Sequence, residues 1–127
     1  MIDSATDRLG AARYVVLTTF RRDGTPVPTA VWVAPLEDGL GVWTATGSGK
    51  VKRIRHDGRV ELAESDSRGR PLGPAVAGTA RVLDEAGTRR VLTAIRRKYG
   101  IVGQVLTALS RLRRGTAGTA GLAITLR

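Results

Sequence analysis

The first part of the chain shows the hydrophobic patterning of short strands. Three runs rich in β-branched and aromatic residues are separated by two Asp-Gly pairs, which are strong turn signals. Pro26, Pro28 and Pro35 lie near the ends of the second run and indicate an edge strand or a strand that bends. The predicted strands are Tyr14–Phe20, Val27–Leu36 and Leu40–Thr46.

The pattern then changes to a helical period. Ser48 is a suitable N-cap, Val51 and Ile54 are spaced to face a core, and Gly58 is placed to end the helix. Further along, strand-like and helix-like segments alternate, with Gly100 separating two helical stripes. The predicted elements are a helix over Lys50–Asp57, strands over Arg59–Asp66 and Ala75–Leu83, helices over Asp84–Tyr99 and Ile101–Arg114, and a last strand over Leu122–Leu126.

This order of elements predicts a mainly β fold with inserted helices. Strands joined by tight turns do not form a doubly wound parallel sheet, and six short strands favour a small antiparallel barrel. The length of 127 residues fits a single domain over residues 1–127, with residues 1–8 as a loose N-terminal segment.

Charge is unevenly distributed along the chain. Residues 1–85 carry 12 basic and all 11 acidic residues, so +9 of the net +10 lies in residues 86–127. Such a charge suggests an anionic partner. However, 18 of the 21 basic residues are Arg, as expected for a GC-rich genome, and the basic segment has one aromatic residue and no nucleic-acid-binding motif. Solvated helix faces are therefore the simpler interpretation, and a nucleic-acid partner is not expected.

Several kinds of chemistry are excluded by what the chain lacks. Without cysteine there is no thiol chemistry or disulfide, and with His56 as the one histidine no multi-histidine metal site is expected. His56 ends the predicted short helix, where a surface histidine is favourable. The N-terminus lacks a signal-peptide core, and no apolar run is long enough for a membrane span, so we expect a cytoplasmic protein.

The segment Trp43–Arg55 (WTATGSGKVKRIR) carries the clearest candidate chemistry. It combines a strand, a Gly/Ser turn and a helix start, and helix N-terminal N–H groups together with Ser48, Lys50 and Arg53 suit a phosphate. It is not a Walker A motif, because Thr44 and Val51 stand where that motif needs glycine and a hydroxyl residue. The alternative is a capped amphipathic helix with a solvated basic face.

Three segments together carry a family resemblance over about residues 9–127. LTTFRRDGTPVPTAVWV (Leu17–Val33), VWTATGSGKVKRIRHDGRVEL (Val42–Leu62) and SRGRPLGPAVAGTARVL (Ser67–Leu83) resemble the pyridoxamine-phosphate-oxidase-like split β-barrel proteins that bind FMN or a deazaflavin. The combination is most similar to the actinobacterial branch of this family that uses coenzyme F420. The resemblance implies a six-stranded antiparallel split β-barrel, working as a homodimer with its cofactor groove between the subunits.

The resemblance also implies positions for the cofactor. Its phosphate would meet Ser48, Lys50 and Arg53, and Arg55 and Arg59 would extend the anionic path. The loop with Arg68 and Arg70 would reach the cofactor of the partner subunit. The ring system would lie along the second and third strands, at Thr29, Val31, Trp32, Trp43 and Thr44; from the residues alone, Trp32 and Trp43 fit a core equally well.

The implied activity is that of an F420H2-dependent reductase, transferring a hydride to an activated alkene, quinone or tetrapyrrole-like acceptor. The run of Lys50, Lys52, Arg53 and Arg55 suits a polyanionic tail better than the single phosphate of FMN. Hydride transfer needs orientation and water exclusion more than a catalytic triad, so no catalytic residue is assigned. The alternatives are an FMN-binding oxidoreductase, a non-catalytic F420 carrier and, more distantly, a basic nucleic-acid-binding barrel.

Overall fold

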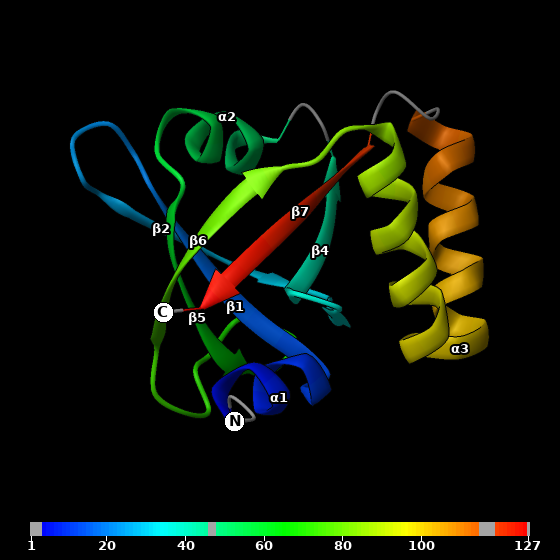
Figure 1. The fold of residues 1–127 in the computed structure, drawn as a ribbon, viewed down its shortest axis with the longest axis horizontal. Coiled ribbons are helices and arrows are strands. Elements are labelled where there is room, and N and C mark those ends of the chain that lie inside the picture. The colour runs from blue at the N-terminus through cyan, green and yellow to red at the C-terminus, as the bar shows by residue number, and fades with distance from the viewer. Residues whose placement is uncertain (1–3, 46–47, 115–118, 127) are drawn as a thin grey trace.

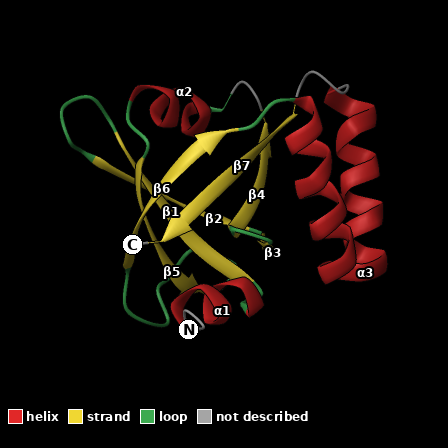
Figure 2. Ribbon diagram, viewed as in Figure 1, coloured by secondary structure: helices red, strands yellow, loops and turns green. Residues whose placement is uncertain are grey.

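Seven strands form one antiparallel sheet in the computed structural model, which describes residues 4–45, 48–114 and 119–126 (Figures 1 and 2). Three helices lie at the periphery of this curved sheet, with α2 at one end, α1 at the other and α3 along one side. The helices are α1 (Ser4–Ala11), α2 (Gly49–His56) and α3 (Glu85–Arg114), and the strands are β1 (Tyr14–Phe20), β2 (Pro26–Val31), β3 (Val33–Leu36), β4 (Gly39–Ala45), β5 (Arg59–Ser65), β6 (Val76–Val82) and β7 (Thr119–Leu126).

The order of strands in the sheet is β2-β1-β5-β6-β7-β4-β3, and this order defines the split barrel. The two edge strands, β2 and β3, are consecutive in sequence and are separated by Trp32 alone. The mainly β split-barrel fold is confirmed, but the expected count of six strands is wrong. The run Val27–Leu36 was predicted as one strand, and it divides because its first part pairs with β1 and its second part with β4.

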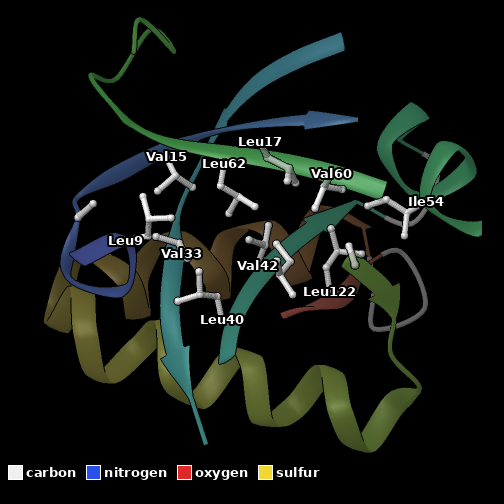
Figure 3. Packing of buried hydrophobic residues seen from close by; sticks show 13 residues of the cluster. Leu9, Val15, Leu17, Val33, Leu40, Val42, Ile54, Val60, Leu62 and Leu122 are labelled. Carbon is white, nitrogen blue, oxygen red and sulfur yellow. The ribbon is translucent and has the colours of Figure 1, made fainter. Parts of the chain in front are cut away.

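The interior of the barrel is filled by aliphatic side chains from all parts of the sheet (Figure 3). Leu17 and Leu62 face each other across the β1–β5 ladder, and Val42 and Leu122 do so across the β4–β7 ladder. All four side chains are fully buried. Burial of such residues is the main favourable contribution to folding.

Two Asp-Gly turns set the register of the first four strands, as the sequence predicts. Gly24 has a φ of 89°, a left-handed conformation that glycine adopts without strain. At Gly39 the reason for glycine is space, because a Cβ there would lie 2.3 Å from the carbonyl oxygen of Ile124.

The helices agree with prediction except at the N-terminus. Gly100, with φ 62° and ψ −139°, interrupts α3 where two separate helices were predicted, and the two halves run side by side (Figure 1). A loose segment was expected over residues 1–8, but Ser4–Ala11 forms α1, and Leu9 is fully buried in the barrel core; residues 1–3 lie outside the described residues.

Candidate functional site

Helix α2 begins directly beyond the end of β4, at one end of the barrel (Figure 1). Ser48 occupies the N-cap position with extended backbone angles, but its side chain makes no capping hydrogen bond. The Ser48 hydroxyl instead lies 3.4 Å from the hydroxyl of Thr44. Ser48 is therefore at the predicted N-cap position, but among the described residues no side chain caps the N–H groups of the first turn of α2.

Lys50 and Arg53, one turn apart, gather positive charge at this helix start. Both side chains are half-buried, and the pKa of Lys50 is lowered by burial and by the neighbouring charge of Arg53. The Arg53 guanidinium folds back over Gly49, where a Cβ would lie 2.5 Å from Nη1. Arg53 Nε donates a 2.6 Å hydrogen bond to Oγ1 of Thr19, a fully buried residue of β1. The guanidinium is thus fixed by the barrel itself.

This pair of cations has no acidic partner among the described residues. The ion pairs found there join Arg70 to Asp66 and Arg89 to Glu85, and the first turn of α2 contains no acid. Half-buried cations without a counter-ion raise the free energy of the folded chain, and an anion bound at the helix N-terminus would relieve that cost. The donor set, which combines a guanidinium fork, an ammonium and uncapped N–H groups, fits a phosphate group.

Arg55 and Arg59 lie near the same end of the barrel but differ in their contacts. Arg55 is exposed near the end of α2. Arg59 starts β5 and places its guanidinium carbon 4.0 Å from the ring centroid of Phe20. His56, the last residue of α2, is exposed as predicted. Both arginines therefore stand outside the half-buried pair formed by Lys50 and Arg53.

Arg68 and Arg70 lie in the β5–β6 loop, at the opposite end of β5 from Arg59. Seven residues of strand span about 20 Å, so these arginines do not join α2 within one chain. The Asp66 carboxylate organises the loop by accepting hydrogen bonds from the backbone N–H groups of Arg68 and Arg70. It also forms an ion pair with the Arg70 side chain at 3.1 Å. These bonds lower the pKa of Asp66.

The residues expected along the ring system are spread over two faces of the sheet. Thr29 and Val31 belong to β2, where Val31 packs against the barrel core, and Thr44 lies beside Ser48. Trp32 and Trp43 instead pack in a second apolar cluster, with residues of α3. Trp43 Nε1 is buried and has no hydrogen-bond partner in the described part of the chain. The core interpretation of both tryptophans thus agrees with their packing.

A second group of polar contacts, which the sequence did not indicate, surrounds Lys98 and Tyr99 at the junction of α3 with the β2–β3 break. Tyr99 stacks on Trp32 with ring centroids 4.2 Å apart, and its hydroxyl donates to the carbonyl oxygen of Arg13 at 2.7 Å. Lys98 is half-buried and its ammonium donates to the carbonyl oxygens of Ala12 and Val33. Burial lowers the pKa of Lys98 to about 8 and raises that of Tyr99.

Sequence reasoning placed Lys98 on a solvated face and did not single out Thr19. The available signal for Lys98 was that it is the one lysine among the basic residues after position 86. Thr19 carries no such signal, since its contact with Arg53 joins residues 34 positions apart. Among the described residues no group of three or more His, Cys, Asp or Glu side chains could hold a metal ion. No helix within the same residues is long and apolar enough to cross a membrane.

Comparisons with known proteins agree on the fold. The sequence profile described as pyridoxamine 5'-phosphate oxidase matches residues 1–120. A comparison with curated protein sequences finds no significant match.

Several solved structures are similar to this chain, and three of them illustrate the range. The protein Rv2991 from Mycobacterium tuberculosis is 20% identical, with a TM-score of 0.70 over 100% of this chain and 82% of its own. An F420 reductase is 21% identical, with a TM-score of 0.64 over 99% of this chain and 96% of its own. HutZ, a heme storage protein from Vibrio cholerae, is 10% identical, with a TM-score of 0.70 over 98% and 89%. At these identities the likeness concerns the fold alone.

Proposed function

This chain belongs to the pyridoxamine 5'-phosphate oxidase family, and on that premise we propose that it is an F420H2-dependent reductase. The acceptor would be an activated alkene, a quinone or a tetrapyrrole-like molecule. The observation that carries the proposal is the half-buried pair Lys50 and Arg53, which lies at an uncapped helix start with no acidic partner among the described residues. A structural neighbour described as an F420 reductase supports the same choice.

In this proposal Lys50, Arg53 and Ser48 hold the phosphate of the coenzyme, with Arg55 and Arg59 along the path of its anionic tail. Arg53 is pre-positioned by Thr19, so little side-chain entropy is lost when an anion binds. Thr29, Val31 and Thr44 would line the path of the ring system. When bound, reduced F420 supplies the hydride; the protein supplies orientation and exclusion of water.

Homodimer formation is part of the proposal. Arg68 and Arg70 lie at the end of β5 remote from α2, so they can meet a coenzyme bound at α2 only across a subunit interface. Trp32 and Trp43 pack against α3, so in this proposal they support the strands that line the ring site and do not stack on the coenzyme.

FMN is the second candidate cofactor, favoured by the description of the matching family profile. The cation pair at α2 would accept either phosphate, but the exposed Lys52 and Arg55 continue the positive charge along the helix. A longer polyanion gains from that continuation, whereas a single phosphate does not. Relative affinity for the two cofactors therefore tests the assignment directly.

The test is a fluorescence titration of the purified protein with F420 and with FMN at two salt concentrations. We expect F420 to bind more tightly than FMN, and Lys50→Met to weaken F420 binding. Lys52→Met is the matched comparison, because it removes the same charge from an exposed position of the same helix; it should weaken F420 binding less than Lys50→Met, since an exposed charge contributes less. Equal loss in the two variants, or no binding of either cofactor, would contradict the assignment.

Turnover separates a reductase from a carrier. Reduced F420 would be mixed with a panel of quinones, enones and biliverdin, and its reoxidation followed in the presence and absence of the protein. A protein that binds F420 tightly and accelerates none of these reactions is a carrier. A protein that binds DNA with a steep salt dependence and binds no cofactor would support the nucleic-acid alternative.

A further inference from the structure

A groove of about 1030 Å³ lies between α1, β3 and α3. Figure 2 shows α1 at one end of the sheet and the first half of α3 along its side, with β3 between them. On α3 the lining residues follow helical spacing, at positions 86, 89, 90, 93, 94, 97 and 98. One face of the helix therefore borders the groove along about three turns.

The groove combines apolar walls with a basic rim. Gly10, Ala11, Pro35, Leu36 and Ala94 supply apolar surface. Glu37 is the one acidic residue in the lining, against four basic side chains, which are Arg89, Arg90, Arg97 and Lys98.

The charges of this rim are mostly unneutralised. Arg90 and Arg97 are exposed and have no acidic partner in the described part of the chain, and Arg89 meets Glu85 only at 3.8 Å with both side chains exposed. Exposed pairs at such a distance contribute little. The electrostatic potential over the groove is therefore positive. A ligand that covers the apolar walls would remove their surface from water, which is favourable.

This groove is separate from the candidate coenzyme site. It is bordered by Leu36 and Glu37, at the turn where β4 begins, whereas Ser48 and α2 follow the other end of β4. Seven strand residues separate the two ends by about 20 Å. A ligand in the groove would thus not compete with an anion held by Lys50 and Arg53 of the same chain.

We propose that this groove is a second binding site, for a small amphipathic anion with an apolar body and one acidic group. Its volume is at the upper end of the usual range for small-molecule pockets, about 300–1,000 Å³. The apolar body would lie on Pro35, Leu36 and Ala94, and Arg90 and Arg97 would meet the acidic group. Net positive charge selects against neutral and cationic molecules of the same shape.

Two fluorescent probes with nearly the same apolar body test the proposal. 8-Anilinonaphthalene-1-sulfonate carries one sulfonate, and N-phenyl-1-naphthylamine carries no charge. In titrations of the full chain we expect the sulfonate to bind at least ten-fold more tightly. The double variant Arg90→Glu/Arg97→Glu should remove this preference and leave binding of the neutral probe unchanged.

The matched control is Arg21→Glu/Arg22→Glu, which makes the same change of charge at two exposed arginines next to and within the β1–β2 turn. It should keep the preference for the sulfonate, as should Lys50→Met. Thr93→Trp, at an exposed lining position of α3, should weaken binding of both probes by filling the groove. Circular dichroism would verify that each variant is folded.

Three outcomes would overturn the proposal. Equal binding of the two probes by the wild-type chain would show that charge does not select the ligand. Loss of sulfonate binding in Lys50→Met would place the probe at α2 instead. If the wild-type chain binds neither probe and Thr93→Trp converts a dimer into a monomer in sedimentation experiments, the groove is an interface between two copies of the chain.

Discussion

Two half-buried lysines at separate places in this molecule differ in how their charge is satisfied. The ammonium of Lys98 donates to the carbonyl oxygens of Ala12 and Val33, so it ties α3 to the N-terminal segment and to β3. The ammonium of Lys50 has no hydrogen-bond acceptor among the described residues, and its neighbour is another cation, Arg53. Burial lowers the pKa of both lysines.

The comparison separates two uses of a partly buried charge. Where the protein supplies the acceptors, as for Lys98, the charge stabilises a junction between elements. Where it supplies none, as for Lys50, the folded chain carries an electrostatic cost that an external anion can remove. Both lysines are half-buried, and the pKa of both is lowered. Neither property identifies a binding residue unless the hydrogen-bond acceptors around its ammonium are also known.

The largest expected effect is on anion binding at Lys50. Replacing Lys50 by methionine keeps most of the apolar stem and removes a charge-assisted contact of about 1.5–3 kcal/mol, equivalent to roughly a ten- to hundred-fold loss of affinity. Titration with F420 measures the loss, and Lys52→Met, which removes an exposed charge of the same helix, should lose less affinity. Lys98→Met should leave this affinity unchanged; a similar loss there would remove the distinction between the two lysines.

The next effect is on stability at Lys98. Lys98→Met leaves the carbonyl oxygen of Ala12 without its lysine donor, and we expect the free energy of unfolding to fall by about 1–3 kcal/mol. Urea denaturation measures it, with the exposed Arg97→Met as control. By contrast, Lys50→Met should leave the urea midpoint unchanged or raise it, because an unpaired charge is removed. Loss of stability in Lys50→Met would show that Lys50, too, is structural.

A smaller effect is expected at Thr19, which positions Arg53. Thr19→Val removes the acceptor of Arg53 Nε with little change of shape, and the net cost to stability should be about 1 kcal/mol. The charge at α2 stays the same, so affinity for F420 should fall by several-fold, less than in Lys50→Met. If Thr18→Val, at the preceding half-buried residue, lowers affinity equally, Thr19 has no special role.

The smallest effect is a pH dependence of stability, because Lys98 is half-exposed and solvent screens the cost of its charge. Because the pKa of Lys98 in the folded chain is about 8, below the ordinary 10.5, the unfolded chain binds more protons between these values. The contribution of Lys98 to the free energy of unfolding should therefore rise as pH increases from 8 toward 10. Urea midpoints of the wild type and Lys98→Met at pH 7.5 and 9.5 measure it. A difference between the two proteins that is independent of pH would contradict a lowered pKa.

Much of the fold follows from local sequence. The Asp-Gly turns, the interruption at Gly100 and the strand periods predict most elements to within a residue or two. Trp32 was not predicted as a strand break because the sequence around it is continuously strand-like. The break arises from pairing with two different partners, β1 and β4, which is a property of the whole sheet and not of the local sequence. Helix α1 was missed because Leu9 is its one fully buried anchor.

The candidate site divides in the same way. Ser48, Lys50 and Arg53 lie within six residues, so the turn, the helix start and the helical period bring them together without help from the rest of the chain. Thr19, Lys98 and Tyr99 take their roles from contacts with residues 34 to 86 positions away. Spacing along the sequence carries no information on such contacts, and they become visible only in the folded barrel.

The placement of β2 and β3 at the two edges of the sheet has a consequence for solubility. An exposed edge strand offers unpaired N–H and C=O groups to any other extended chain, which is a route to aggregation. Pro26 and Pro28 on one edge and Pro35 on the other have no N–H, so each edge offers fewer donors for such pairing. Replacing these prolines should thus increase aggregation at high protein concentration before it changes the fold.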